Sequence, residues 1–421
     1  MGSEKSVFLI PGVADTRGPN TAAESEAGAV PGPLVQPAAE LSQEELLRYS
    51  RQIIIPEIGM IGQLRLKNAR VLVIGAGGLG SPALLYLAAA GIGSIGIIDA
   101  DVVDTSNLQR QVIHSMASIG QLKTESAAAR IKELNPLVDV HVHSYALDVG
   151  NAREIFSAYD VILDGTDNFA TRYLVNDAAA LCGKPYVWGS ILRFDGQVSV
   201  FWDAHGPNYR DLYPTPPPAG SVPSCSEGGV FGVLCAQIGS VMVAETIKLI
   251  TGVGQSLLGR VLILDSLDMR WREVKLQADP QAAQITELLR NYEAFCAGPV
   301  STSASAGLSD EQLPQLSAPQ LARRLAERAA GKHEFLLVDV REAGEHEIVA
   351  IPGALLAPKG AILSGEITLP RDTELIVHCK SGVRSAAVLR FLQDQGYNSV
   401  ENLRGGILAW IAEVDPSLHT Y

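Results

Sequence analysis

One cysteine stands between a β-branched apolar run and a helix-like run in LIVHCKSGVRSAAVLRFL, residues 375–392. In a tight loop from a strand into a helix, backbone N–H groups and the helix dipole converge on the sulfur of Cys379 and stabilise an anion there. Arg384 follows Cys379 after four intervening residues. A cysteine phosphatase has one residue more, so the tighter loop favours a terminal sulfur over a phosphate. We predict that Cys379 and Arg384 are catalytic; an inert packed cysteine is the alternative.

A glycine-rich loop lies near the front of the chain, in VLVIGAGGLGS at residues 71–81. Gly75, Gly77 and Gly80 have the spacing G-x-G-x-x-G between a predicted strand and a predicted helix, where phosphates bind to unpaired backbone N–H groups. Asp99 ends the next predicted strand, at the place from which a carboxylate reaches a ribose hydroxyl. We predict a nucleotide site that includes Gly78 as well. The glycines alone also fit an NAD or FAD site.

Further polar residues follow this loop and extend the predicted site. Asn107, Arg110 and Lys123 form a cluster that hydride transfer does not need. A triphosphate does need it, because cations balance its charge and the charge of a departing pyrophosphate. Asp167 and Asn168 follow the predicted strand DVIL, at the carboxyl end where open α/β sheets bind ligands. A carboxylate there suits Mg²⁺ bridging phosphates, so the pattern predicts ATP with Mg²⁺ on Asp167.

Two α/β frameworks must position these residues. From Arg70 onward, strand and helix patterns alternate as in a doubly wound parallel sheet, which predicts a Rossmann-like α/β fold. Small and polar residues then interrupt the apolar pattern before a second, smaller α/β unit. We predict a disordered tail at 1–38, a nucleotide-binding domain at 39–295, a linker at 296–312 and a sulfur-handling domain at 313–421.

The composition narrows the class of function. Of the 421 residues, 47% are hydrophobic and 19% are charged, as in globular domains. The formal net charge of -13 argues against nucleic acid as the main partner. We find no apolar run approaching the roughly 20 residues of a membrane span and no secretory signal, so we expect a cytoplasmic protein without a membrane partner. The five cysteines contain no C-x-x-C pair, so they predict neither a disulfide framework nor a thiolate zinc site.

Residues 41–295 resemble the ThiF/MoeB family, the ubiquitin-activating-type adenylyltransferases that activate small sulfur carrier proteins. The resemblance rests on motifs that occur in family order: LLRYSRQIIIPEIG, VLVIGAGGLGSP, DADVVDTSNLQRQ, GQLKTESA, LDGTDNFATR, GQVSVF and PSCSEGGVFG. It implies that Asp99 holds the ribose and that Asp167 binds magnesium. It also implies that the phosphates are gripped by Asn107, Arg110 and Lys123.

The same resemblance has three further implications. It implies that Arg51 enters the nucleotide site from the other subunit, which would make the active form a homodimer. Cys225, in PSCSEGG, matches a cysteine that forms a thioester or acyl-disulfide intermediate in some relatives, although a structural cysteine fits equally. Many relatives hold a structural zinc with two C-x-x-C pairs. Here Asn208 and Asp211 replace the first pair and ADPQAAQI replaces the second, so we do not expect zinc.

The chain after residue 312 resembles rhodanese, through LVDVRE, IPGA, HCKSGVRSA and NLRGGILAW. That resemblance implies a persulfide on Cys379. The fusion of the two domains, together with the missing zinc ligands, is similar to the adenylyltransferase/sulfurtransferases of actinobacteria.

Together the resemblances imply one reaction sequence. ATP converts the C-terminal glycine of a ubiquitin-like sulfur carrier, ending in Gly-Gly, into an acyl-adenylate. The persulfide on Cys379, loaded from a donor such as thiosulfate, then gives the carrier thiocarboxylate. The carrier could serve cysteine biosynthesis, molybdenum cofactor biosynthesis or another pathway. Two alternatives are a non-catalytic scaffold that binds nucleotide and carrier, and an NAD-dependent oxidoreductase fused to a phosphatase-like domain.

Overall fold

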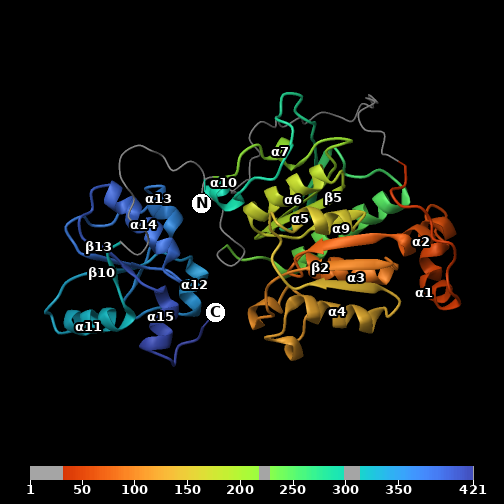
Figure 1. Cartoon of the computed structure of the whole chain (residues 1–421). Coiled ribbons are helices and arrows are strands. Elements are labelled where there is room, and N and C mark those ends of the chain that lie inside the picture. The colour runs from red at the N-terminus through yellow and green to blue at the C-terminus, as the bar shows by residue number, and fades with distance from the viewer. Residues whose placement is uncertain (1–31, 218–227, 298–312, 421) are drawn as a thin grey trace. The chain divides into compact units, whose positions relative to one another are not determined.

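The chain folds into two units, residues 1–300 and 301–421 (Figure 1). The first unit is built around an eight-stranded sheet. The computed structural model describes residues 32–217, 228–297 and 313–420. The strand order is β3-β2-β1-β4-β5-β6-β7-β8. The strands are β1 (Arg70–Ile74), β2 (Ser94–Ile98), β3 (Asp139–His143), β4 (Val161–Asp164), β5 (Tyr186–Leu192), β6 (Asp195–Phe201), β7 (Arg260–Asp265) and β8 (Arg270–Lys275).

The direction of the strands creates a ligand site at one edge of this sheet. Strands β3, β2, β1, β4 and β5 are parallel, and β6 to β8 continue antiparallel. The chain runs from β1 outward to β2 and β3, and then returns to β4 on the other side of β1. Ligands of open α/β sheets bind at such a switch point, outside the carboxyl ends of the strands.

Helices cover both faces of the sheet because alternate residues of its central strands point to opposite sides. Val71 and Val73 of β1 enter one core, and Leu72 and Ile74 enter the other. The first core contains side chains from α3 (Gly80–Ala90), α4 (Lys123–Leu134) and α9 (Gly232–Thr251). The second contains side chains from α5 (Ala152–Ser157), α6 (Phe169–Leu181), α7 (Tyr209–Leu212) and α10 (Tyr292–Ala297). Helices α1 (Gln43–Ile53) and α2 (Gly59–Asn68) precede the sheet.

Helix α9 corrects the expectation that no apolar run reaches the length of a membrane span. By length and composition alone, its 20 residues could cross a membrane. However, Leu234, Ile238 and Met242 of α9 are buried in the first core, and α9 packs closely on α3, where a Cβ on Gly239 would lie 2.7 Å from Cγ of Pro82. In this structure α9 is a core helix of the first unit.

The second unit is a smaller parallel sheet in the order β11-β10-β12-β13-β9. Its strands are β9 (Gln315–Leu316), β10 (Leu336–Asp339), β11 (Leu355–Leu356), β12 (Leu375–His378) and β13 (Val400–Leu403). Its helices are α11 (Ala318–Ala329), α12 (Ala343–Ile348), α13 (Lys359–Leu363), α14 (Val383–Asp394) and α15 (Gly406–Glu413). The central strand β12 again contributes side chains to two hydrophobic cores, with Val377 in one and Ile376 in the other. The predicted fold class is therefore confirmed in both units.

The predicted segment boundaries differ from the structure at two places. Leu34 N–H donates to the carbonyl of Leu249 at 3.0 Å, and Val35 is buried in the first core. Order thus begins before the predicted end of the tail at residue 38. Helix α10 runs to Ala297, past the predicted start of the linker at 296. Residues 1–31 and 298–312 lie outside the described residues, so the disorder of the tail and linker stays a prediction.

Candidate functional site

A cavity of about 370 Å³ opens at the carboxyl edge of the first sheet, where the strand order reverses. Nine of the predicted nucleotide-site residues line it, whereas Gly80 and Arg51 do not: Gly75, Gly77, Gly78, Asp99, Asn107, Arg110, Lys123, Asp167 and Asn168. These residues come from loops after β1, β2 and β4 and from the start of α4. The switch-point topology has therefore brought together side chains that are far apart in the sequence.

The glycine loop needs its glycines for close backbone approaches. Gly75 has φ +88°, a conformation that other residues rarely adopt. A Cβ on Gly80 would lie 1.8 Å from the carbonyl oxygen of Gly75, and one on Gly78 would lie 2.8 Å from Sγ of Cys235. The loop therefore turns tightly into α3 and leaves bare backbone facing the cavity, as phosphate binding requires.

Asp99 is tied to the glycine loop. Its Oδ2 accepts the N–H of Ala76 at 2.8 Å, and its Oδ1 accepts the N–H of Asp101 at 2.8 Å. The side chain is half-buried at the end of β2. Both bonds fix a negative charge at the position where a ribose would lie next to the phosphates.

The predicted phosphate-binding side chains each have a local partner. Lys123, buried at the first position of α4, forms an ion pair of 2.8 Å with exposed Asp101. Arg110 is half-buried and donates to the carbonyl of Ser106 at 3.0 Å. Asn107 accepts the N–H of Asp104 at 3.2 Å and closes a short 3₁₀ turn. These bonds hold the three polar groups at the wall of the cavity.

The loop after β4 carries Asp167 and Asn168. Asp167 is exposed, so its carboxylate is accessible to a cation. Asn168 is the N-cap of α6, and its Oδ1 accepts the N–H of Thr171 at 2.8 Å. The helix cap thus uses the side-chain oxygen Oδ1 of Asn168, and the side-chain NH2 group is left to donate to a ligand.

Sequence reasoning missed two residues that support this loop. Asp164, fully buried, accepts the N–H and the hydroxyl of Thr166 through Oδ1, at 3.0 and 2.7 Å. Its Oδ2 has no hydrogen bond within the described residues. Burial raises the pKa of Asp164, although the positive charge of Arg172 acts to lower it. Arg172 lines the cavity and donates twice to the carbonyl of Thr166. Both residues stand in LDGTDNFATR, the motif that gave Asp167, so this motif was the available signal.

Two predicted residues, Arg51 and Cys225, are not among the described residues that line the cavity. Arg51 lies exposed in the last turn of α1 and does not line the cavity of its own chain. Cys225 lies outside the described residues. Their predicted roles stay predictions.

The positions expected to lack zinc ligands are joined by hydrogen bonds. Asp211 accepts the N–H of Asp279 through Oδ1 at 2.8 Å and the N–H of Asn208 through Oδ2 at 2.7 Å. These bonds tie α7 to the segment ADPQAAQI. Among the residues that the structure describes, no group of three or more His, Cys, Asp or Glu side chains is arranged to hold a metal ion.

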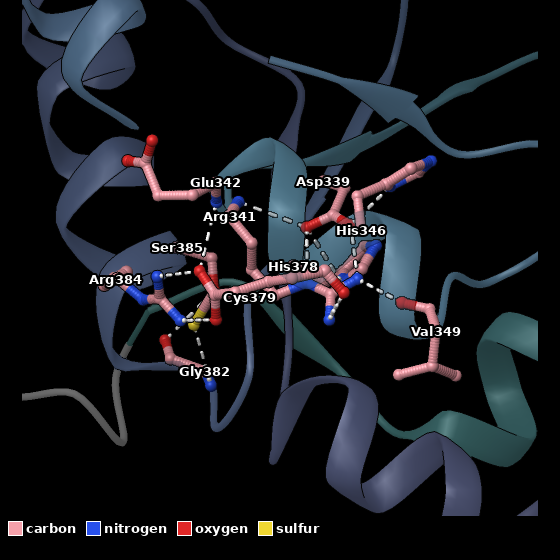
Figure 2. A network of polar contacts seen from close by, with 11 residues as sticks. Asp339, Arg341, Glu342, His346, Val349, His378, Cys379, Gly382, Arg384 and Ser385 are labelled. Atoms are coloured by element: carbon pink, nitrogen blue, oxygen red, sulfur yellow. Dashed lines mark hydrogen bonds and ion pairs between the residues drawn. The ribbon is translucent and has the colours of Figure 1, made fainter. Parts of the chain in front are cut away.

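The second site is the loop from β12 into α14, which carries Cys379 (Figure 2). Cys379 is buried, and its sulfur accepts the N–H of Gly382 at 3.1 Å and the hydroxyl of Ser385 at 3.4 Å. Gly382 has φ +99° at the start of α14, and Asn402 holds its carbonyl with a bond of 3.0 Å. Sequence reasoning did not assign the hydroxyl of Ser385 to the sulfur.

A second turn supports this loop from behind. The N–H of Ile407 donates to the carbonyl of Cys379 at 2.9 Å, and the N–H of Leu408 donates to that of Lys380 at 3.1 Å. A Cβ on Gly406, which has φ +58°, would lie 2.4 Å from both carbonyl oxygens. The glycines of NLRGGILAW therefore allow the two turns to touch.

Arg384, predicted to be catalytic, is paired inside the unit. Its Nη1 and Nη2 each donate to one carboxylate oxygen of Glu345 on α12, both at 2.7 Å. Both side chains are largely buried. The structure thus balances the charge of Arg384 with Glu345, whereas the N–H of Gly382 and the hydroxyl of Ser385 donate to the sulfur.

A buried polar cluster lies behind Cys379 (Figure 2). Asp339 at the end of β10 accepts Nε of Arg341 at 2.8 Å and Nδ1 of His346 at 2.9 Å. Although burial opposes ionisation, the hydrogen bond from Arg341 and the charges nearby hold the pKa of Asp339 below its usual value. Burial lowers the pKa of His378, adjacent to Cys379, to about 4, so its imidazole is neutral at pH 7.

The two sites define a two-domain protein with a nucleotide-binding α/β unit and a cysteine-loop unit. Residues 49–284 match the ThiF family, and residues 318–413 match the rhodanese-like domain. The chain belongs to the ThiF family and, over its length, to the enzymes that join a ThiF domain to a rhodanese-like domain. It is therefore an adenylyltransferase and sulfurtransferase, which implies ATP as a substrate and decides against the scaffold and oxidoreductase alternatives.

Two relatives are similar over nearly the whole chain, and a solved structure is similar over about half of it. The probable adenylyltransferase/sulfurtransferase MoeZ of Mycobacterium tuberculosis is 53% identical over 395 residues, which cover 92% of this chain and 98% of the relative. The adenylyltransferase and sulfurtransferase MOCS3 of Drosophila grimshawi is 38% identical over 401 residues, with 91% and 87% covered. A crystal structure of MccB of E. coli with MccA-N7isoASN has a TM-score of 0.52 at 22% identity, covers 56% of this chain and 73% of that chain, and shows the fold alone.

Proposed function

We propose that this chain uses ATP to adenylate the C-terminal glycine of a ubiquitin-like sulfur carrier that ends in Gly-Gly. A persulfide on Cys379 then supplies sulfur to give the carrier thiocarboxylate. The observation that carries the proposal is that one cavity is lined by the glycine loop, by the cations Arg110 and Lys123, and by the carboxylates Asp99 and Asp167. We also propose that the protein is cytoplasmic.

Each group in the cavity has a place in adenylation. Backbone N–H groups of the glycine loop would hold phosphates at the start of α3, and Asp99 would accept a ribose hydroxyl. A carboxylate oxygen of the carrier attacks the α-phosphorus, and pyrophosphate leaves. Arg110, Lys123 and Asn107 stabilise the charge that develops on the leaving group.

Asp167 fits a magnesium ligand, because Mg²⁺ in phosphate sites is usually held by one or two carboxylates and the phosphates themselves. Its exposed carboxylate at the cavity provides one such ligand, and the ion would add positive charge beside the phosphates. Asp164 and Arg172 would position Asp167 through the turn at Thr166.

The sulfur steps use the cysteine loop. The Cys379 thiolate attacks the outer sulfur of thiosulfate, so that sulfite leaves and a persulfide remains. Its terminal sulfur attacks the carbonyl carbon of the acyl-adenylate, AMP leaves, and an acyl disulfide forms. A second thiolate then attacks Sγ of Cys379 and releases the thiocarboxylate. This thiolate is Cys225 or a cellular thiol, and a further thiol reduces the resulting disulfide.

We also propose a homodimer in which Arg51 reaches the cavity of the partner subunit. Arg51 is exposed and does not line the cavity of its own chain, which supports a role in another chain.

The test of the function is the mass of the carrier. The full chain is incubated with ATP, Mg²⁺, thiosulfate and a thiol reductant, together with each small protein of the same cell that has a ubiquitin-like sequence ending in Gly-Gly. One such carrier should exchange one oxygen for one sulfur in an ATP-dependent reaction, and its identity would assign the pathway. ATP-independent sulfur gain, or no gain with any carrier, would contradict the proposal.

A further inference from the structure

The order of the strands gives a map of a bound nucleotide along the cavity. The sheet runs β4, β1, β2, β3 at this edge, and the predicted groups follow the same order. Asp167 follows β4, the glycine loop follows β1, and Asp99 follows β2. Phosphates on the glycine loop and ribose at Asp99 therefore direct the base toward the segment after β3.

That segment brings an aromatic side chain to the cavity. Tyr145, Ala146 and Leu147 line the cavity just beyond β3. The residue Tyr145 is 47% exposed and lines the cavity, so one part of its ring is available to a ligand. Aromatic rings bind nucleobases by stacking, and the stack does not depend on hydrogen bonds.

A chain of hydrogen bonds sets the position of this ring. The hydroxyl of Tyr145 lies 3.0 Å from Nδ1 of His143, and Nε2 of His143 lies 3.1 Å from the hydroxyl of Tyr159. Tyr159 is buried, and its ring reaches His143 across β2 because residue 96 has no side chain: a Cβ on Gly96 would lie 2.2 Å from the Tyr159 hydroxyl. Burial lowers the pKa of His143, which favours a neutral imidazole that can bond to both tyrosines.

The backbone around Tyr145 is also held in place. The hydroxyl of Ser144 bonds to that of Thr124 in α4 at 2.7 Å, and the carbonyl of Ala146 accepts Nδ2 of Asn151 at 2.9 Å. The segment is therefore fixed on both sides of Tyr145. A ring held by its backbone and by its hydroxyl loses little conformational entropy when a base binds against it.

We infer that Tyr145 is the wall against which the nucleobase of ATP stacks, and that His143 and Tyr159 are positioning residues for it. This inference rests on the proposed function, because it takes ATP as the ligand. If the inference holds, Tyr145 contributes to the affinity for the base, whereas the glycine loop and the cations contribute to the affinity for the triphosphate.

The test compares two ligands by isothermal titration calorimetry with Mg²⁺ and the full chain: ATP and ribose 5-triphosphate, which lacks the base. Tyr145→Ala should weaken ATP binding about tenfold and leave ribose 5-triphosphate binding unchanged. Tyr145→Phe and His143→Ala keep the ring but remove the hydroxyl bond. Each should weaken ATP binding about twofold to threefold, again without effect on ribose 5-triphosphate, and should raise the KM for ATP without changing kcat.

Val149→Ala is the matched control, since Val149 is exposed in the same loop but does not line the cavity. If Tyr145→Ala weakened the binding of ATP and of ribose 5-triphosphate equally, Tyr145 would have a structural role and the inference would be overturned. So would unchanged ATP binding in that variant when wild-type protein binds ATP. Wild-type protein that binds neither ligand would refute the proposed function, and the inference with it.

Discussion

The nucleotide cavity and the cysteine loop handle charge in opposite ways. In the cavity, Asp101 and Asp167 are exposed, and Lys123 is paired with the exposed Asp101. In the cysteine unit, the pair of Arg384 and Glu345 is largely buried and Arg341 is fully enclosed with Asp339. A ligand can exchange partners with groups in the cavity at little cost, whereas the buried pairs are fixed. The cavity thus suits a highly charged, exchanging ligand, and the loop suits a small sulfur anion held by neutral donors.

The largest effect should come from the exposed carboxylate of the cavity. Asp167→Ala should lower carrier-dependent exchange of pyrophosphate into ATP by more than about a hundredfold, because it removes the magnesium ligand. Sulfur transfer from thiosulfate to cyanide at Cys379 should be unchanged. Glu154→Ala, an exposed acidic residue on α5, is the control. Exchange at the wild-type rate would remove Asp167 from the mechanism.

Breaking the buried pair of Arg384 and Glu345 should instead lower the stability of the second unit. Glu345→Ala leaves the Arg384 charge buried without its carboxylate, which should cost the second unit about 3–5 kcal/mol. Hydrogen exchange followed by mass spectrometry should show this as faster exchange in peptides from β10 and β12. Replacing both residues with leucine should restore much of the protection. Glu347→Ala, exposed on the same helix, is the control. Unaltered exchange in Glu345→Ala would show that the pair does not stabilise the loop.

The burial of His378 predicts a pH dependence for the stability of the second unit. Burial lowers the pKa of His378 from its ordinary value of 6.5 to about 4, so below pH 6.5 the unfolded chain takes up a proton that the folded unit does not. Stability therefore falls as the pH drops from 6.5 toward 4. Hydrogen exchange in β12 should become faster over this window, and His378→Phe should reduce the slope. An equal slope in that variant would assign the effect to other groups.

The smallest effect concerns metal. Because Asp211 accepts backbone hydrogen bonds from both segments in which the family resemblance implies zinc ligands, we predict no stoichiometric zinc. Elemental analysis of the purified chain, and melting of the first unit with and without a chelator, should both show no dependence on zinc. One tightly bound zinc per chain would mean that other ligands have taken over.

The sequence predicted the parts of the sites that follow strand ends. Gly75, Asp99 and Asp167 each follow a predicted strand, and parallel strands bring their carboxyl ends to one edge, so the cavity could be anticipated. The partners of these residues could not. Glu345 meets Arg384 only through tertiary packing.

The same limit applies to other elements. The contacts of Tyr145 depend on Gly96 and Tyr159, which lie on other elements. The length of the apolar helix α9 was not predicted from the sequence, and the packing of α9 in the first core identifies it as a core helix. Spacing along the chain predicts which strand end carries a residue, whereas side-chain partners from distant elements require the folded structure.

The central claim is that the two sites act in sequence on one carrier, with Cys379 delivering sulfur and taking no part in adenylation. The most direct measurement is thiocarboxylate formation by Cys379→Ala with either thiosulfate or inorganic sulfide as the sulfur source. The account predicts wild-type pyrophosphate exchange, no thiocarboxylate from thiosulfate, and rescue by sulfide, which attacks the acyl-adenylate directly. Cys225→Ala in parallel should keep sulfur transfer to cyanide, and it should lose thiocarboxylate only if Cys225 is the second thiol. Thiocarboxylate formed from thiosulfate at the wild-type rate by Cys379→Ala would contradict the account, since the persulfide would then form on another residue.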